Sequence, residues 1–231
     1  MKKNELIEKL SKCLEEYKTY KTIFVAIDGV DTSGKTTLAD ELKENIKKRK
    51  IYRVSIDGFH NDKKIRLSKG EYSPEGYYED SFKYESIIEN VFNPIINGKK
   101  RIIPKIFDYR NNEETIKEII NIPDKSVIIF DGVFLLRNEI QDYWDLSIFL
   151  EISFNEVIKR ALKRDIEYFE DEKLLLKKYK ERYIPGQKLY FEREKPKLRA
   201  DIIIDNNDFD NPEILETKKF KPDLGSAVRS G

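Results

Sequence analysis

The chain has 231 residues, and 39% of them are hydrophobic, including 13 Tyr and 13 Phe, which is enough apolar side chain for a core and excludes global disorder. Its 44 Lys and Arg against 43 Asp and Glu leave a net charge of +1, which gives no overall field for nucleic acid or an anionic membrane. The lone cysteine, Cys13, excludes a disulfide framework, and the lone histidine, His60, excludes a histidine-rich metal site. No apolar run reaches the roughly 20 residues that cross a bilayer, and the start lacks a signal-peptide core. We expect a cytoplasmic protein without nucleic-acid or membrane partners, and a homo-oligomer is left open.

The predicted elements alternate between strands and helices. A helix is expected over residues 4–18, where Leu6, Leu10 and Leu14 recur at helical spacing, and another over 35–49. Short apolar runs predict buried strands at 22–27, 51–56, 127–130, 146–150 and 202–204, and a helix is expected to start near Asn155, a good N-cap. Such an order is typical of a parallel sheet with helices on both faces. The sequence therefore predicts an α/β fold with three α/β/α layers and roughly five strands.

Three of these strands end in Asp-Gly, at residues 28–29, 57–58 and 131–132. Ligands of open α/β sheets bind outside the carboxyl ends of the strands, so three carboxylates at that edge indicate a site. Asp-Gly is also a common turn former, which is the alternative interpretation. Asp28 is the least suited to chemistry, because its side chain must leave room for the loop that follows.

That loop matches the pattern G-x-x-x-x-G-K-S/T at residues 29–36. Its backbone N–H groups and the dipole of the following helix cradle phosphate oxygens, Lys35 reaches the outer phosphates and the Thr36 hydroxyl ligates Mg²⁺. A buried strand before the motif and a helix after it support a P-loop NTPase fold. The predicted ATP-binding residues are Gly29, Val30, Asp31, Thr32, Ser33, Gly34, Lys35, Thr36 and Thr37.

The chain contains no Asn-Lys-x-Asp motif of the kind that reads guanine, and its length disfavours a motor, which leaves phosphoryl transfer from ATP to a small acceptor. Asp57 is the predicted catalytic carboxylate, since it ends a strand beside the phosphate loop and can take the acceptor proton. Asp131 is predicted to hold Mg²⁺ or its waters, with Thr36 and Asp57 as further metal ligands. Lys35 and Arg164 complete the predicted catalytic set. The alternative for each aspartate is a turn residue.

Two segments outside the predicted sheet are interpreted as covers. Residues 163–195 are dense in charge and predict a helical lid, and residues 59–84 are polar and aromatic and are expected to cover the acceptor. Both fall within one predicted domain, residues 1–210. The end of the chain, residues 211–231, is expected to be a disordered or non-native tail.

Six motifs in order resemble the uridine kinase branch of P-loop kinases, near phosphoribulokinase and pantothenate kinase: AIDGVDTSGKTTLADEL, SIDGFHN, SPEGYYEDSF, FDGVFLLRNEIQDYWD, RALKRD and YIPGQKLYF. They run from about Ile23 to Asp205. The resemblance implies ATP, Mg²⁺ and transfer of the γ-phosphate to a primary hydroxyl, which is the 5′-hydroxyl in nucleoside kinases. It places Asp57 at the family's catalytic aspartate, Asp131 at a glutamate of similar role, and Arg164 in an Arg-Asp pair that begins the lid.

The acceptor side departs from the family pattern. Nucleoside kinases of this branch hold the ribose with an aspartate where this chain has Tyr77, with Asp80 nearby, and their pyrimidine-reading tyrosine is here Phe107 with the histidine missing. His60 is interpreted as a substrate contact or a structural histidine, and the lid arginines as clamps or solvated charges. The expected acceptor-binding residues are Phe59, His60, Tyr77, Asp80, Phe107, Asp108, Arg110, Arg160, Arg182 and Gln187.

Three functions follow from these observations. The first is a kinase for the 5′-hydroxyl of uridine or cytidine. The second is a kinase for another alcohol, such as a pantothenate-like, sugar or modified nucleoside acceptor. The third, from a different class, is a nucleotide-binding regulator or nucleic-acid end-processing component without small-molecule turnover.

Overall fold

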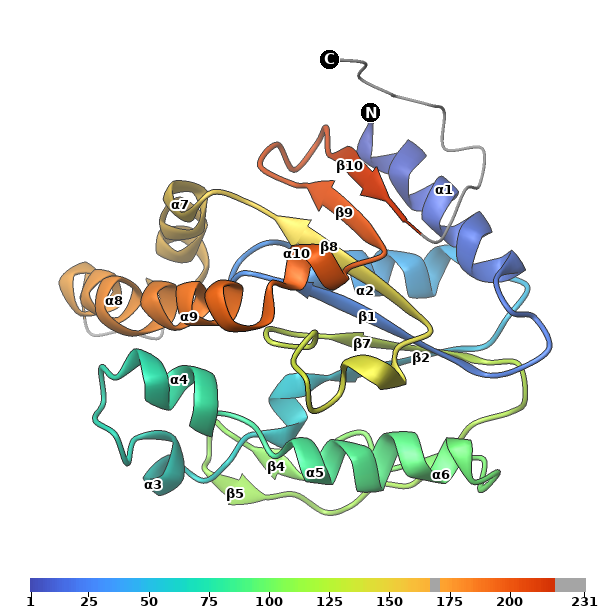
Figure 1. Ribbon diagram of the computed structural model, residues 1–231, viewed down its shortest axis with the longest axis horizontal. Coiled ribbons are helices and arrows are strands. Elements are labelled where there is room, and N and C mark those ends of the chain that lie inside the picture. The colour runs from blue at the N-terminus through green and yellow to red at the C-terminus, as the bar shows by residue number, and fades with distance from the viewer. Residues whose placement is uncertain (167–170, 219–231) are drawn as a thin grey trace.

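The computed structural model describes residues 1–166 and 171–218 (Figure 1). The first half of the chain forms α1 (Lys3–Glu16), β1 (Ile23–Gly29), α2 (Lys35–Asn45), β2 (Ile51–Ser55), the 3₁₀ turn η1 (Ile56–Phe59), α3 (Lys63–Arg66), α4 (Pro74–Asp80), α5 (Tyr84–Ile87), the π-helical η2 (Ile88–Phe92) and α6 (Asn93–Ile96). Two short hairpin sheets follow, formed by β3 (Arg101–Ile102) with β6 (Ile120–Asn121) and by β4 (Phe107–Asp108) with β5 (Glu113–Glu114). The second half forms β7 (Val127–Asp131), η3 (Gln141–Tyr143), β8 (Leu146–Glu151), α7 (Phe154–Arg164), α8 (Glu172–Lys178), the π-helical η5 (Tyr179–Tyr183), α9 (Ile184–Glu194), α10 (Pro196–Arg199), β9 (Ile202–Asp205) and β10 (Glu213–Thr217).

The central sheet has six strands in the order β10-β9-β8-β1-β7-β2. The five strands from β2 to β9 form four parallel pairs, and β1 lies between β7 and β8, with Val25 opposite both Ile129 and Leu146. Only β10 is antiparallel, at the edge beside β9. This arrangement confirms the predicted parallel α/β sheet, and β10 is the strand beyond the five that the sequence predicted.

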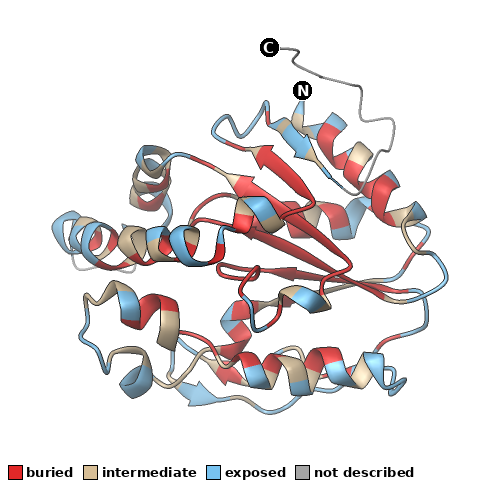
Figure 2. Cartoon of the chain, in the orientation of Figure 1, coloured by how far each residue is buried: buried red, intermediate tan, exposed pale blue. Residues whose placement is uncertain are grey.

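Two apolar cores cover the two faces of the sheet, because successive strand residues point to opposite sides. Ile23, Val25 and Ile27 of β1 pack in one core with α1 and α2. Phe24 and Ala26 pack in the other core with α4, α5 and α9. Figure 2 shows the buried strands between the two helical layers, which confirms the predicted three-layer architecture.

The structure corrects three expectations about element boundaries. The helix predicted over 35–49 ends at Asn45, and the helix predicted to begin near Asn155 is capped by Ser153, whose Oγ accepts a hydrogen bond of 3.2 Å from the Glu156 N–H. Part of the predicted tail is ordered, since Ile214 of β10 pairs with Ile204 of β9. A sheet edge accepts such a short polar strand because one of its sides stays in solvent. The rest of the predicted tail, 219–231, lies outside the described residues.

The two predicted covers are both helical. The predicted lid contains the end of α7 and then α8, η5 and α9, and its residues 167–170 lie outside the described part of the chain. The segment 59–84 contains α3 and α4, and its aromatic residues Tyr77, Tyr78 and Phe82 are buried in the core shared with α9. This segment therefore contributes to the core.

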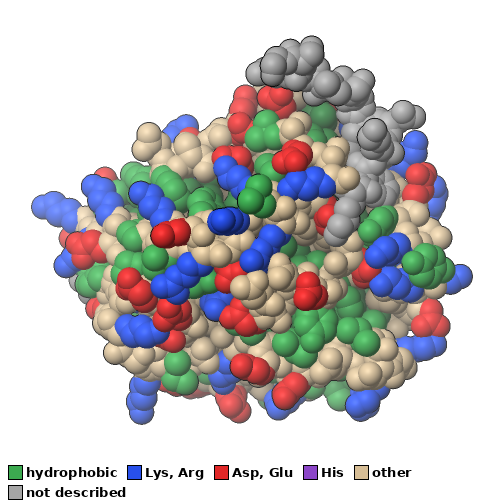
Figure 3. Space-filling model, in the orientation of Figure 1, with side chains coloured by type: hydrophobic (Ala, Val, Ile, Leu, Met, Phe, Trp, Pro, Cys, Tyr) green, Lys and Arg blue, Asp and Glu red, His purple; other side chains and the backbone are tan. Residues whose placement is uncertain are grey.

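Within residues 1–166 and 171–218, no helix combines the length and the apolar character needed to cross a membrane. Acidic and basic side chains are interspersed over the face shown in Figure 3, in keeping with the net charge of +1.

Candidate active site

A cavity of about 490 Å³ opens at the carboxyl ends of β1, β2 and β7. This volume lies in the range of small-molecule sites. Its wall combines the loop after β1, the ends of β2 and β7, and residues of α4 and α7. The predicted site residues on this wall are Asp31, Thr32, Gly34, Lys35, Thr36, Thr37, Asp57, His60, Tyr77, Asp131, Arg160 and Arg164.

The phosphate-binding loop turns sharply between β1 and α2. Gly29 has a φ of 149°, and a Cβ there would lie 2.4 Å from the Leu150 carbonyl oxygen of β8. Val30 and Ser33 are buried beneath the loop. Because α2 begins after Gly34, the first N–H groups of this helix lack helical partners and are available to an anion.

Gly29→Ala is expected to weaken ATP binding by more than about tenfold and to lower stability by roughly 1–3 kcal/mol, because the new Cβ overlaps backbone that cannot move aside. The matched control is Gly98→Ala, where the φ is 73° but no atom lies within 4 Å of the new Cβ. The control should keep its ATP affinity and lose only about 1 kcal/mol of stability. Equal ATP affinity in Gly29→Ala and wild type, measured by calorimetry, contradicts this reading of the loop.

Lys35 lies folded back over the loop. Its Nζ donates a hydrogen bond of 2.6 Å to the Val30 carbonyl oxygen and lies 3.4 Å from Ser33 Oγ. Burial lowers the pKa of Lys35, while the carboxylates of Asp31 and Asp28 oppose that shift. The ammonium group is thus held at the loop with little contact with water, where an added phosphate can replace the neutral backbone carbonyl.

Thr36 and Asp131 form a pair of oxygen donors beside the loop. Thr36 Oγ1 donates to Asp131 Oδ2 over 2.8 Å, and Arg53 Nε orients the same carboxylate over 2.8 Å. Hydroxyl and carboxylate oxygens suit Mg²⁺, which commonly takes its remaining ligands from phosphate and water. The described residues contain no cluster of three or more carboxylate, histidine or cysteine ligands. The chemistry of the Thr36–Asp131 pair fits a metal held jointly with a nucleotide, and a metal contact from Asp57 stays a prediction.

Asp57 stands in η1, directly after β2, where its N–H faces Ser55 Oγ at 3.4 Å. Its side chain is 57% exposed, and this exposed surface faces the cavity. Desolvation by the surrounding protein and the negative charge of Asp131 raise the pKa of Asp57. A carboxylate with a raised pKa accepts a proton more readily than an ordinary aspartate does.

His60 is both a cavity residue and a structural one. Its Nδ1 lies 3.1 Å from the Asp57 carbonyl oxygen, and its ring stacks on Tyr109 with centroids 4.7 Å apart. Burial lowers the pKa of His60 to about 4, so the ring is neutral at pH 7. The structure thus places His60 on the cavity wall with structural contacts, and its contact with a substrate stays a prediction.

Asp28 is buried beneath the loop and joins three segments. It accepts hydrogen bonds from the Gly29 N–H at 2.6 Å, the Leu136 N–H at 3.2 Å and the Tyr190 hydroxyl of α9. Burial raises the pKa of Asp28 from its ordinary value of 3.8 to about 6. These contacts agree with the expectation that Asp28 serves structure.

Asp28 should make the stability depend on pH. The folded carboxyl keeps its proton up to about pH 6, whereas the unfolded one releases it near 3.8, so this stabilisation is complete below 3.8 and is lost as the pH rises through 6. Relative to Asp28→Asn, which does not titrate, the free energy of unfolding of the wild type should fall by up to about 3 kcal/mol between pH 4 and 7. Urea unfolding of both proteins across this range measures the difference, and parallel pH curves contradict it.

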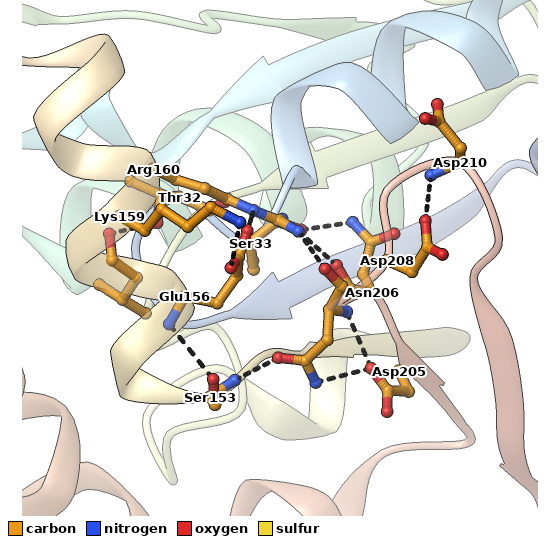
Figure 4. Close-up of polar contacts among 12 residues, drawn as sticks. Thr32, Ser33, Ser153, Glu156, Lys159, Arg160, Asp205, Asn206, Asp208 and Asp210 are labelled. Carbon is orange, nitrogen blue, oxygen red and sulfur yellow. Dashed lines mark hydrogen bonds and ion pairs between the residues drawn. The ribbon is translucent and has the colours of Figure 1, made fainter.

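Arg160 serves the nucleotide side of the cavity. Figure 4 shows its guanidinium between the phosphate loop and the loop after β9. It donates to the Asn206 carbonyl oxygen at 2.7 Å and to the Thr32 carbonyl oxygen at 3.4 Å, and Asn206 Nδ2 in turn donates to the Ser33 carbonyl oxygen. Arg160 therefore supports the phosphate loop, and its contact with an acceptor stays a prediction.

Arg164 reaches the cavity from the end of α7. Its Nε and Nη2 donate to Asp165, at 2.5 and 2.9 Å, and Asp165 also accepts from the Tyr179 hydroxyl at 2.6 Å. Its side chain is 57% exposed. The arginine is positioned by its neighbour and open to the cavity.

Seven expected acceptor residues do not line the cavity. Their positions follow from packing and from hydrogen bonds to other parts of the chain. Phe59 and Phe107 are buried in the apolar interior. Asp80 pairs with Lys69 at 2.9 Å, Asp108 accepts a hydrogen bond from the Arg110 N–H in a turn, and the Arg110 guanidinium contacts the ring of Tyr109. Arg182 donates to the carbonyl oxygens of Arg66, Gly70, Glu71 and Ser73, and Gln187 contacts Asp31 of the phosphate loop. These residues lie outside the cavity lining, Gln187 reaches the cavity only through the loop, and their roles toward an acceptor stay predictions.

The cavity also contains residues that the sequence reading missed. Ser55, Phe82, Gly132, Val133 and Phe209 also line it. Phe209 is 38% exposed, although it sits in an otherwise polar loop. A lone aromatic residue among Asn and Asp was the available signal for it.

Comparisons with known proteins identify the family of the chain. The model of the phosphoribulokinase/uridine kinase family matches residues 24–206. A uridine kinase of Mycoplasma pneumoniae is 30% identical over 80% of this chain and 85% of its own length. A uridine kinase of Staphylococcus aureus strain JH9 is 31% identical over 62% of this chain and 69% of its own length.

Solved structures share the fold. The structure described as a possible uridine kinase from Bacillus stearothermophilus superimposes with a TM-score of 0.68 at 23% identity, covering 87% of this chain and 97% of that one. D-glycerate 3-kinase from Cryptococcus neoformans var. grubii gives a TM-score of 0.59 at 10% identity, covering 90% of this chain and 99% of that one. Taken with the family match, the loop and the cavity, they lead to one conclusion: the chain belongs to the phosphoribulokinase/uridine kinase family and is an ATP-dependent phosphotransferase that acts on a hydroxyl group.

Proposed function

We propose that this protein transfers the γ-phosphate of Mg·ATP to a primary hydroxyl of a neutral small molecule, and that the acceptor is the 5′-hydroxyl of uridine or cytidine. The observation that carries the proposal is the shared cavity of Lys35, Asp57 and the Thr36–Asp131 pair. The uridine kinases at about 30% identity support the nucleoside as acceptor.

The phosphates seat on the loop, where Lys35 turns from the Val30 carbonyl to the outer phosphate oxygens. Mg²⁺, held by Thr36 and Asp131, would supply neutralisation of the phosphate charge. The acceptor hydroxyl lies against Asp57, which takes its proton as the new oxygen–phosphorus bond forms and the bond to ADP breaks. Arg164 binds the transferring group, and closure of the lid helices excludes water from it.

The lining of the cavity supports a neutral acceptor. Outside the loop residues themselves, the lining includes a neutral His60, Tyr77 and Phe82. Arg66 and Arg182 do not line the cavity, and both donate to backbone carbonyl oxygens. A phosphorylated acceptor needs guanidinium or ammonium groups of its own, so this lining favours a nucleoside over a phosphorylated sugar.

A coupled ADP-release assay with Mg·ATP tests the proposal. The acceptors are uridine, cytidine, purine and deoxy nucleosides, pantothenate and phosphorylated sugars. We expect ADP release that depends on uridine or cytidine. If neither uridine nor cytidine gives ADP release but another alcohol does, the proposed acceptor is wrong and the proposed phosphoryl transfer stands. Tight ATP binding without any acceptor-dependent ADP release supports a regulator instead.

A further inference from the structure

Asp31 is an unusual residue for its place, because it puts a carboxylate inside a loop built to bind phosphate. The loop binds phosphate through backbone N–H groups, so its chemistry does not call for a side chain at this position. A negative charge there opposes the charge of the ligand. The carboxylate of Asp31 therefore needs an explanation other than nucleotide binding.

Two neutral donors hold this carboxylate, and both come from other parts of the chain. The Tyr77 hydroxyl of α4 donates to Asp31 Oδ2 over 3.2 Å, and Gln187 Nε2 of α9 donates to the same oxygen over 2.8 Å. Burial and the charge of Asp31 raise the pKa of Tyr77, so its hydroxyl remains a donor. Gly186 permits the arrangement, since a Cβ there would lie 2.8 Å from Tyr77 Cδ1 and 2.9 Å from the Pro74 carbonyl oxygen.

The second oxygen of Asp31 is left for a ligand. Both of these side-chain bonds end on Oδ2, and across residues 1–166 and 171–218 no hydrogen bond to Oδ1 is found. Asp31 lines the cavity together with Asp57, and burial together with the charge of Asp57 raises the pKa of Asp31. Two carboxylates on one small cavity can accept hydrogen bonds from two hydroxyls of a single molecule.

We propose that Asp31 Oδ1 binds a second hydroxyl of the acceptor, next to the one that Asp57 deprotonates, so that the substrates are polyhydroxy alcohols. This inference rests on the proposed kinase function and deepens it. Tyr77 and Gln187 are positioning residues, which orient Asp31 and leave its free oxygen toward the acceptor. The carboxylate that the resemblance placed at position 77 is thus supplied from the phosphate loop.

The test combines Asp31→Asn with acceptors that lack one hydroxyl. With uridine, Asp31→Asn should raise the acceptor KM by roughly 10–100-fold, the usual effect of losing a hydrogen bond to a charged group, and leave the KM for ATP within about twofold. The wild type should lose a similar factor with either 2′-deoxyuridine or 3′-deoxyuridine. Asp31→Asn should not discriminate against that deoxynucleoside, because the partner of the missing hydroxyl is already gone.

Two further variants separate binding from folding. Tyr77→Phe removes one donor to Asp31 and should raise the acceptor KM by a few fold without changing the KM for ATP. Asp142→Asn, an exposed acid in η3, should match the wild type. An unchanged acceptor KM in Asp31→Asn, or discrimination that persists in this variant, overturns the inference.

The outcome is independent of the identity of the acceptor. If uridine and cytidine are silent but another polyhydroxy alcohol is phosphorylated, the nucleoside proposal fails and the same comparison is made with that alcohol and its deoxy form. Turnover only of alcohols with a single hydroxyl, or no turnover of any polyhydroxy alcohol, overturns the role of Asp31.

Discussion

Asp57→Asn should keep its ATP affinity and lose roughly 10²–10⁴-fold in kcat, the range attributed to a general base. The amide of asparagine has the size of the carboxylate but cannot take the acceptor proton. Asp57 contacts neither Lys35 nor the Thr36–Asp131 pair through a hydrogen bond in the described structure, so nucleotide binding should be spared. Steady-state kinetics with the acceptor from the panel, and calorimetry with a non-hydrolysable ATP analogue, measure the two effects.

The pH dependence of the rate provides a second readout for Asp57. Because desolvation and the charge of Asp131 raise the pKa of Asp57, the acid limb of the kcat/KM profile should lie above the ordinary aspartate range near 3.8. That limb should vanish in Asp57→Asn. The control is Asp142→Asn, which should keep both the rate and the limb. Near-normal turnover by Asp57→Asn removes this residue from the catalytic role.

The positions of the phosphate loop and of the aspartates at the strand ends could be predicted because they depend on short stretches of sequence. The spacing from Gly29 to Thr36 and the Asp-Gly pairs at 57–58 and 131–132 follow apolar runs directly. Parallel strands bring their carboxyl ends to one edge, so residues that follow such runs meet without further information. The structure accordingly places Lys35, Asp57 and Asp131 on one cavity.

The acceptor side could not be predicted in this way. Gln187 contacts Asp31 across 156 residues, and Arg182 reaches the Ser73 carbonyl oxygen across 109 residues. Whether an arginine faces a ligand or a backbone carbonyl depends on how helices pack, and the charge density of a segment does not contain that information. Phe59 shows the same limit, since its place beside Asp57 predicts a site residue while its ring packs on Phe130 in the core.

Lys35→Ala should differ from Asp57→Asn by impairing both steps. We expect a rise in the KM for ATP together with a lower kcat, and a loss of roughly 10²–10³-fold in kcat/KM, because the ammonium group binds the phosphates and stabilises the charge that develops on them. Lys35→Met should behave alike, since it removes the charge and keeps most of the packing against the loop. The matched control is Lys43→Ala, an exposed lysine of the same helix.

Comparing the two lysine variants with Asp57→Asn shows which part of the cavity binds the phosphates and which part binds the acceptor. Loss of ATP affinity in Lys35→Ala but not in Asp57→Asn places the phosphates at the loop and the acceptor at the end of β2. Unchanged kinetics in both lysine variants contradict the loop assignment, because no other ammonium group lines the described cavity. Loss of ATP affinity in Asp57→Asn as well means that Asp57 contributes to the Mg·ATP site, and the search for the base then moves to Asp31, whose carboxylate faces the same cavity.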